Sequence, residues 1–512
     1  MMRKKEVLVK RLLAAALIPL SLFGSALGSL YSTLDPTSVA QHFAFYELYP
    51  NTQEGREALK HAWELLSGNC SDCDPDVVFP SADAKPIISL VNRSTPSAPI
   101  LEEKELAVIE KLAHHLPNRK LKGSSLWTWD ELLATAPEEL DIARGLLIAE
   151  LGSAPEQKLK IRSYEASLDL MALQIVARLT PESTDLEKVR AINDYIFSEL
   201  RFRFPPHSLY AKDIDLYTLL PAVIDSRRGV CLGVSILYLS LAQRLALPLQ
   251  AITPPGHIYV RYEPPTGTVV NIETTARGID VPSDMYLSLE TRKLQKRNIK
   301  EVIGLAFMNQ AAVAWHKEDS KTAIELYEKG RNFLPNDPLI QTFLGYQYLF
   351  VGDEAKGKAL LAAIQDVVPD HAVVSDTTTA DYLAGRVSAK GIQAIYQEVN
   401  ETRKSILEKQ KQLEGIVAEY PLFRNGLLHL AITHLQLGRE KEAIPILEKC
   451  MEIDANNPTV CYYLAALYTQ RMNYNAAWKS LKAAEAIVQK RDHTPRALTD
   501  LRMNLQRACP EP

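Results

Sequence analysis

Three side chains in the middle of the chain have the types and spacing that cysteine-based acyl transfer needs. Cys231 stands at the start of an apolar segment, His257 follows in Pro-Pro-Gly-His, and Glu273 stands sixteen residues after His257. Nucleophilic cysteine catalysis requires a thiolate, a histidine that exchanges its proton, and a third polar group that orients the imidazole. The sequence therefore predicts Cys231 as the nucleophile, His257 as its base and acid, and Glu273 as the orienting group, with Asn271 in reserve for that third role.

Three predicted elements have to bring these side chains together. The first is an apolar helix near residues 232–245 that Cys231 opens. A helix N-terminus stabilises a thiolate by about 0.3–1 kcal/mol, which is too little to ionise the thiol without a cationic neighbour. Short β-branched runs at 258–262 and 268–273 predict two strands joined as a hairpin. With the turn centred at Pro265, His257 lies opposite Glu273, and Asn271 shares their face.

These residues also carry a resemblance to a known family. The blocks GVCLG at 229–233, GHIYV at 256–260 and NIETT at 271–275 resemble the Cys, His and Asp blocks of the transglutaminase-like cysteine superfamily. The resemblance is greatest to a bacterial branch that joins this domain to tetratricopeptide repeats. It implies a papain-like α+β core at 156–297 and acyl transfer from a peptide or protein amide through a thioester, with Glu273 where most relatives have Asp.

The chain beyond residue 298 repeats itself at a fixed spacing of about 34 residues, which is the length of a tetratricopeptide unit. Pro335 and Pro369 stand one such period apart, as do Ala443 and Ala477. Four units place small residues in two matching positions, which resembles the tetratricopeptide repeat and predicts a superhelix at 298–490. Residues 370–421 keep helical periodicity outside this register, with helices expected at 378–398 and 400–419. The resemblance implies a groove for a peptide or protein partner, and the alternative is an inert spacer.

Residues 1–28 have the pattern of a secretory signal. Five basic residues within the first eleven precede an apolar run at 12–27, with small residues Ala26 and Gly28 before the expected cleavage at Ser29. As a helix the run would reach about 24 Å, short of the roughly 30 Å hydrocarbon core. We expect an exported protein, periplasmic or secreted, that meets the membrane only transiently; a single N-terminal membrane anchor is the alternative.

The remaining segments and the composition complete the expected fold class, mostly α with a small α+β domain. Residues 29–155 predict an irregular helical domain with a Pro-rich linker at 75–99, a helix break at Pro50, a helix end at Gly68 and a helix restart at Pro137. Residues 491–512 are expected as a tail. The 512 residues carry a net charge of -4, so nucleic acid is not an expected partner.

We expect no cofactor and no metal site at the other cysteines. Cys70 and Cys73 predict a local disulfide, and Cys450 and Cys461 occupy packing positions of the repeats. Each member of the candidate triad also has a plain structural interpretation. The sulfur could belong to a small buried side chain (Cys231), the imidazole could be a strand-end hydrogen-bonding group (His257), and the carboxylate could pair with Arg227, Arg228 or Arg277 (Glu273). If all three interpretations hold, the chain is a non-catalytic binding scaffold.

Overall fold

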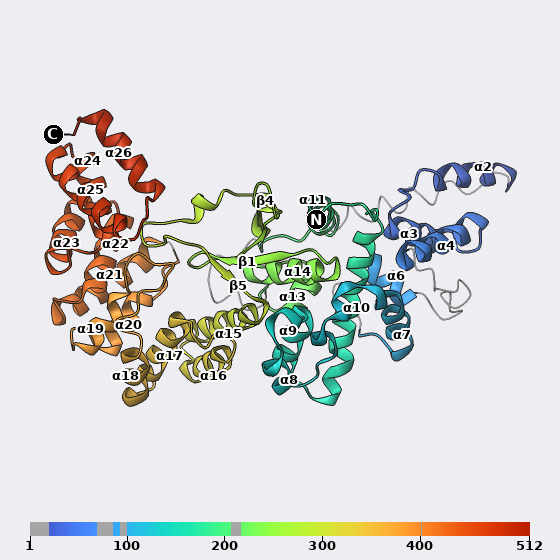
Figure 1. The fold of residues 1–512 in the computed structure, drawn as a ribbon, viewed down its shortest axis with the longest axis horizontal. Coiled ribbons are helices and arrows are strands. Elements are labelled where there is room, and N and C mark those ends of the chain that lie inside the picture. Colours follow the sequence, from blue (N-terminus) through green and yellow to red (C-terminus); the bar gives the residue numbers. More distant parts are fainter. Residues whose placement is uncertain (1–19, 69–84, 93–99, 206–216, 401, 512) are drawn as a thin grey trace. The chain divides into compact units, whose positions relative to one another are not determined.

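The computed structural model describes residues 20–68, 85–92, 100–205, 217–400 and 402–511, and it divides into two compact units (Figure 1). The first unit comprises Met1–Lys120, Pro155–Tyr195 and Arg244–Leu247, and the second comprises Leu121–Ala154, Ile196–Gln243 and Pro248–Pro512. In the part of the chain that the structure describes, helices dominate and the strands form one five-stranded sheet, which confirms the predicted fold class. The units do not follow the predicted domains, because the segment 156–297 contributes to both of them.

The first unit is helical. Its helices are α2 (Leu20–Tyr31), α3 (Val39–Leu48), α4 (Gln53–Ser67), α6 (Lys85–Asn92), α7 (Glu103–Leu112), α10 (Pro155–Val176) and α11 (Asp185–Asn193). The break near Pro50 and the helix end at Gly68, whose φ is +60°, are as predicted. The linker prediction is wrong where α6 forms, since Pro86 stands in its first turn, which tolerates a missing N–H. Most of the signal segment 1–28 lies outside the described residues, and its end belongs to α2.

Helix α10 is buried along most of its length and carries a charge in the core of this unit. Asp169 is fully buried and accepts a hydrogen bond from Arg244 Nε at 2.7 Å and another from Arg119. A buried carboxylate is tolerated when such partners satisfy its oxygens. Within the described residues, none of the helices combines the length and the apolarity needed to cross a bilayer.

The second unit contains the sheet and the helix that begins at Cys231. The strands are β1 (Leu249–Thr253), β2 (Tyr259–Tyr262), β3 (Val270–Glu273), β4 (Ile279–Asp280) and β5 (Gln295–Arg297), in the antiparallel order β4-β3-β2-β1-β5. The helices before the sheet are α8 (Trp129–Ala134), α9 (Ile142–Leu151), α13 (Leu220–Ser226) and α14 (Cys231–Arg244). Pro137 does not restart a helix as predicted; it opens a single 3-10 turn, and Asp141 caps α9.

The predicted hairpin exists, but its register is different. Arg261 pairs with Asn271 and Val260 pairs with Ile272, so Glu273 is in register with Tyr259. His257 lies two residues before Tyr259 and therefore on the same face. The prediction that His257 lies directly opposite Glu273 is therefore wrong. Their side chains still meet, because diagonal neighbours on one face of a sheet are within reach of long side chains.

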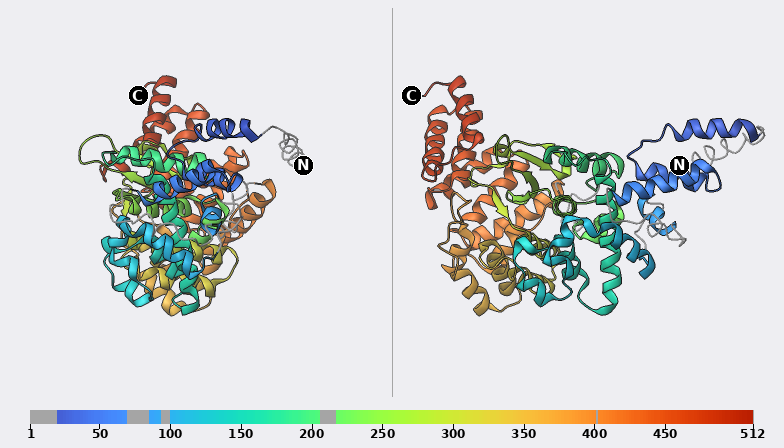
Figure 2. Two further views of the ribbon diagram at one scale, coloured as in Figure 1. Left: turned by 90° about the vertical axis from the view of Figure 1, so that its right-hand side faces the viewer. Right: turned by 45° about the vertical axis from the view of Figure 1, so that its right-hand side comes forward.

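Four antiparallel helix pairs make up the regular repeats. They are α15 (Ile299–His316) with α16 (Ser320–Arg331), α17 (Pro338–Phe350) with α18 (Glu354–Ala362), α22 (Arg424–Gln436) with α23 (Glu440–Ile453), and α24 (Pro458–Gln470) with α25 (Tyr474–Gln489). The predicted small residues lie between the helices of each pair: a Cβ on Gly357 would stand 3.0 Å from the carbonyl oxygen of Gly345. Figure 2 shows the succession of pairs, from yellow to red, in two further views.

Two predictions for the repeats need correction. The helix expected at 378–398 is two helices, α19 (Thr377–Leu383) and α20 (Ala389–Tyr396), which are separated at Gly385 with φ +71°, while α21 (Arg403–Glu419) follows as expected. The segment 491–512 is not an extended tail. It forms α26 (Arg496–Ala508), whose Leu498, Leu501 and Leu505 pack in the same core cluster as α25.

Candidate active site

Cys231 is the first residue of α14, and its side chain is partly exposed. Glycines before and after it allow other segments to pack closely around the helix start. A Cβ on Gly229 would lie 2.4 Å from Val234 Cγ2, and a Cβ on Gly233 would lie 2.3 Å from the carbonyl oxygen of Tyr217. The N–H of Cys231 belongs to the first turn of the helix, where backbone donors have no acceptor within the helix.

His257 joins Cys231 to Glu273. Gly256, with φ +68°, turns the chain just before β2, and the His257 N–H donates to the carbonyl of Pro254 at 3.1 Å. Imidazole Nε2 lies 2.7 Å from Glu273 Oε2, and the Cys231 side chain is near enough to the ring to influence its charge. The histidine side chain is 26% exposed and that of Glu273 is 9% exposed. The structure thus brings together all three predicted site residues.

The Glu273 carboxylate is held at both oxygens. Oε1 accepts hydrogen bonds from the backbone N–H of Thr275 at 3.1 Å and from its hydroxyl at 2.6 Å, while Oε2 accepts from Tyr286 at 2.7 Å as well as from His257. Burial by itself would raise the pKa of Glu273, but these hydrogen bonds lower it to about 2. Among the described residues these contacts take the place of the alternative salt bridge to an arginine.

The histidine is strongly biased toward its charged form. Burial by itself would lower the pKa of His257, but the Cys231 and Glu273 side chains raise it to about 10. At neutral pH the ring is therefore an imidazolium between a sulfur and a carboxylate.

Asn271, the reserve for the third role, lies on the same face but has other partners. Its Oδ1 accepts from Arg261 Nε at 2.8 Å, and its Nδ2 donates to the carbonyl of Val281 at 2.7 Å. It therefore braces the sheet next to the site. Sequence reasoning missed Thr275 and Tyr286. The first belongs to a local side-chain turn that Glu-Thr-Thr makes recognisable, whereas no local signal marks Tyr286.

The remaining cysteine predictions separate into two groups. Cys70 and Cys73 lie outside the described residues. Cys450 and Cys461 are fully buried in the repeats, and burial raises the pKa of Cys450 to about 12 and that of Cys461 to about 11. Within the described residues, no cluster of three or more His, Cys, Asp or Glu side chains is placed to hold a metal ion.

Comparison with known proteins identifies the central module. Residues 162–300 match the family model described as "Transglutaminase-like superfamily". The chain thus contains a transglutaminase-like domain, and all three blocks around Cys231, His257 and Glu273 lie within it. The search of curated proteins found no significant match.

Solved structures that are similar to part of the chain include a TPR protein and MamA. A thermophilic TPR protein in Thermus thermophilus is 16% identical, with 40% of this chain and 98% of that chain covered and a TM-score of 0.20. MamA from Desulfovibrio magneticus RS-1 is 14% identical, with 37% and 97% covered and a TM-score of 0.20. Because these TM-scores are low, the repeat assignment depends on the helix pairs and small residues described above.

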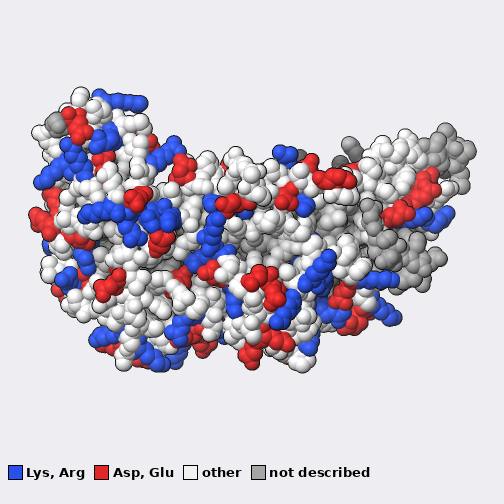
Figure 3. Space-filling view, in the orientation of Figure 1, with Lys and Arg blue, Asp and Glu red and all other residues white. Residues whose placement is uncertain are grey.

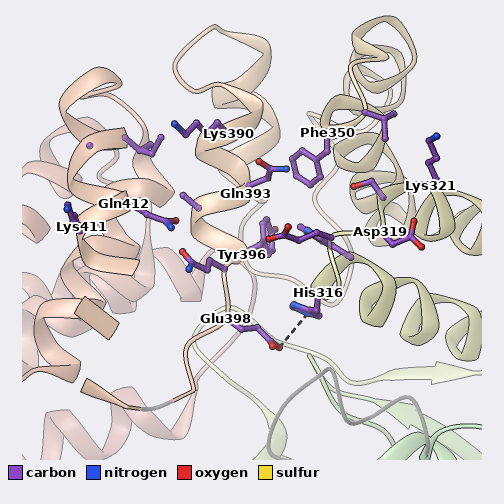
Figure 4. A pocket seen from close by; sticks show the side chains of 18 of the residues that line it. His316, Asp319, Lys321, Phe350, Lys390, Gln393, Tyr396, Glu398, Lys411 and Gln412 are labelled. Atoms are coloured by element: carbon purple, nitrogen blue, oxygen red, sulfur yellow. Dashed lines mark ion pairs between the residues drawn. The ribbon is translucent and has the colours of Figure 1, made fainter. Parts of the chain in front are cut away.

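A groove of about 1270 Å³ lies where the repeat register is interrupted (Figure 4). Lys411 and Gln412 of α21 form one wall, Asp319 and Lys321 the opposite wall, and α20 lies between them. The lining combines three aromatic side chains, three glutamine amides and charges of both signs. These residues are Trp315, Phe350, Tyr396, Gln393, Gln397, Gln412, His316, Glu318, Asp319, Lys321, Lys390, Glu398, Lys411 and Glu419.

Gly415 lines this groove from the interior of α21, and a Cβ there would meet nothing within 4 Å. Gly415→Ala is expected to stabilise the repeats by about 0.5–1 kcal/mol, because alanine loses less backbone entropy in a helix. Gly345→Ala serves as the opposite control: its Cβ would stand 2.8 Å from Leu361 Cδ2, and overpacking costs about 1–3 kcal/mol. Urea unfolding measures both variants, and equal effects would contradict the assignment of Gly415 to open space.

Proposed function

We propose that this protein is an exported transglutaminase-like cysteine hydrolase or acyl transferase that acts on a peptide or protein amide. Cys231 is the nucleophile, His257 is the base and acid, and Glu273 orients the imidazole. The observation that carries the proposal is the position of the His257 ring, which is hydrogen-bonded to the carboxylate of Glu273 and is near enough to the Cys231 side chain for that side chain to raise its pKa. Export is inferred from the signal pattern of residues 1–28.

The reaction runs through a thioester. The Cys231 thiolate attacks the amide carbonyl, and the oxyanion accepts a hydrogen bond from the Cys231 N–H at the start of α14. The His257 imidazolium gives its proton to the departing amine. Once the sulfur is acylated, the contribution of Cys231 to the raised pKa of His257 is lost while burial still lowers it. The imidazole can then take a proton from the water or amine that resolves the thioester.

The repeats supply binding of the substrate protein in this proposal. Glutamine amides both donate and accept hydrogen bonds, as a peptide backbone requires, and the aromatic side chains offer an apolar contact. Among the described residues, the buried Oε1 of Gln397 in the groove has no hydrogen-bond partner. Basic and acidic side chains both line the groove, and both signs are interspersed over the face shown in Figure 3. We therefore expect an extended segment without a large net charge in this groove.

Alkylation of Cys231 by iodoacetamide tests the nucleophile. In the wild type the reaction should remain fast at pH 6, because the imidazolium keeps the sulfur ionised. His257→Ala should slow it about 300-fold at that pH, since an ordinary thiol with a pKa near 8.5 loses about tenfold in thiolate for each pH unit below it. Peptide mass spectrometry identifies the modified cysteine. The alkylation rate of Glu273→Gln should lie between the rates of the wild type and of His257→Ala.

The second candidate function is a binding scaffold with a silent central module. The groove favours it, because none of its lining residues belongs to the transglutaminase-like domain at 162–300. An alkylation profile that rises only near pH 8.5 and is the same in His257→Ala would support the scaffold and refute the enzyme.

A further inference from the structure

Tyr286 contacts two members of the candidate triad. Its hydroxyl donates to Glu273 Oε2, the same oxygen that accepts from His257 Nε2. Its ring stacks on His257, with centroids 6.0 Å apart and an angle of 20° between the planes, and on Tyr259, at 4.5 Å and 19°. Burial and the neighbouring carboxylate raise the pKa of Tyr286, so its hydroxyl stays protonated and acts as a donor.

The chain directly after Tyr286 is attached to the repeats. Residues 287–293, here called the connecting segment, link the 3-10 turn at Ser283–Tyr286 to strand β5 of the sheet, and Figure 1 shows them in yellow-green. Between these two ends the segment contacts the C-terminal helices. His493 Nε2 lies 2.7 Å from the carbonyl oxygen of Ser288, and the Thr459 hydroxyl donates to Glu290 at 2.6 Å. Leu289 packs against the core of α24–α26.

The far end of the connecting segment is held equally firmly. Arg292 donates from Nε to the carbonyl of Asp370 at 2.7 Å and from Nη1 to the carbonyl of Arg491 at 2.8 Å. Thr291 forms an antiparallel bridge with Ala372. Within the second unit, three separate parts of the repeats thus hold this segment: the loop before α19, helix α24, and the turn between α25 and α26.

We infer that Tyr286 is a positioning residue of the candidate triad and that the repeats hold it in place through the connecting segment. Tyr286 fixes the Glu273 oxygen that accepts the hydrogen bond from His257, and it acts on the reacting sulfur only through these two residues. The repeats are then a structural part of the active site as well as a binding surface. This inference rests on the proposed function for its consequence in catalysis, but its geometry has its own test.

The charged groups around His257 and Tyr286 determine the pKa that a titration of His257 will report. The titratable and charged groups around His257 and Tyr286 are Cys231 of α14, Tyr259 and Arg261 of β2, Glu273 of β3 and Asp280 of β4. Tyr286→Phe keeps the ring stack and removes only the hydroxyl. Thr275 still holds Oε1 in this variant, but Oε2 loses the donor that fixes its orientation. We therefore expect the hydrogen bond between Oε2 and His257 to weaken, so that the pKa of the histidine falls, which NMR of the labelled ring follows directly.

The rate of Cys231 alkylation at pH 6 supplies the second readout. Tyr286→Phe should lower it about tenfold, the effect of one hydrogen bond to a charged group. Arg292→Ala removes the hydrogen bonds to Asp370 and Arg491 and so loosens the connecting segment. It should also lower the rate, and it should have no further effect in the Tyr286→Phe background. Arg502→Ala is the matched control, because Arg502 lies on α26 but pairs with Glu485 and Glu511.

Two results would overturn the inference. One is an unchanged His257 titration in Tyr286→Phe, and the other is an Arg292→Ala effect that is equal with and without the Tyr286 hydroxyl. Failure of the proposed function is distinguishable, because it appears as alkylation of the wild type that ignores His257. The NMR titration still decides the role of Tyr286 in that case.

Discussion

Hydrolysis of an acetyl group from Cys231 is expected to slow by about 10²- to 10⁴-fold in His257→Ala, the range that a positioned general base contributes. In the thioester the sulfur carries no charge, and the imidazole between it and Glu273 is the group placed to activate water. The acetyl enzyme is prepared with p-nitrophenyl acetate at high pH, where even an ordinary thiol reacts. Its decay at pH 7 is followed by the mass of the intact protein.

Two features of the chain control this experiment. Cys231→Ser removes the thiol and should give no thioester at position 231, while the fold is expected to persist because the exchange is nearly isosteric. Cys509 is also free and partly exposed, so peptide mass spectrometry is needed to separate a thioester at Cys509 from one at Cys231. The buried Cys450 and Cys461, whose pKa values are raised to about 12 and about 11, should remain unmodified in the folded protein. A thioester that decays at the same rate with and without His257 would exclude the histidine as the base.

Asp381→Ala is expected to destabilise the repeats by about 3–5 kcal/mol, the cost of removing one partner from a buried ion pair. The Asp381 side chain is fully buried on α19. It accepts from the backbone N–H of Arg424 at 3.0 Å and from its Nη2 at 2.7 Å, so it both caps α22 and neutralises the guanidinium. Its loss leaves Arg424 with the weaker contact to Asp454 at 3.4 Å.

Hydrogen exchange in α19 and α22 measures this loss locally, because a chain with two compact units need not unfold in one step. Glu354→Ala is the control. Glu354 pairs with Lys358 on the surface of α18, where both side chains are more than half exposed, and such pairs contribute about 0.5 kcal/mol or less. A similar loss of protection in both variants would show that burial of Asp381 has no special weight.

Local patterns predicted the elements that carry the candidate site. The apolar run that follows Cys231 predicted a helix that starts at this residue, and the β-branched runs predicted β2 and β3. The hairpin register was beyond such reasoning, because seven residues separate the two strands and turn geometry sets the pairing. The strands β1, β4 and β5 were missed, since two of them are too short to show a period of two.

The same division holds for the repeats. A fixed spacing of small residues predicted four helix pairs, because close approach of two helices admits only glycine or alanine at those positions. The segment 491–512 shows no repeat, and only the core it completes with α25 reveals α26 as part of the fold.

The amino-acid order alone therefore predicted the three residues of the candidate triad, Cys231, His257 and Glu273, because helix starts, strand ends and repeat periods depend on neighbours in the chain. Only the tertiary structure decided how they are held. Tyr286 reaches Glu273 from a loop thirteen residues away, and the repeats fix that loop through His493, some two hundred residues further on. Contacts between such distant segments leave no local periodicity, since they arise from the packing of whole elements.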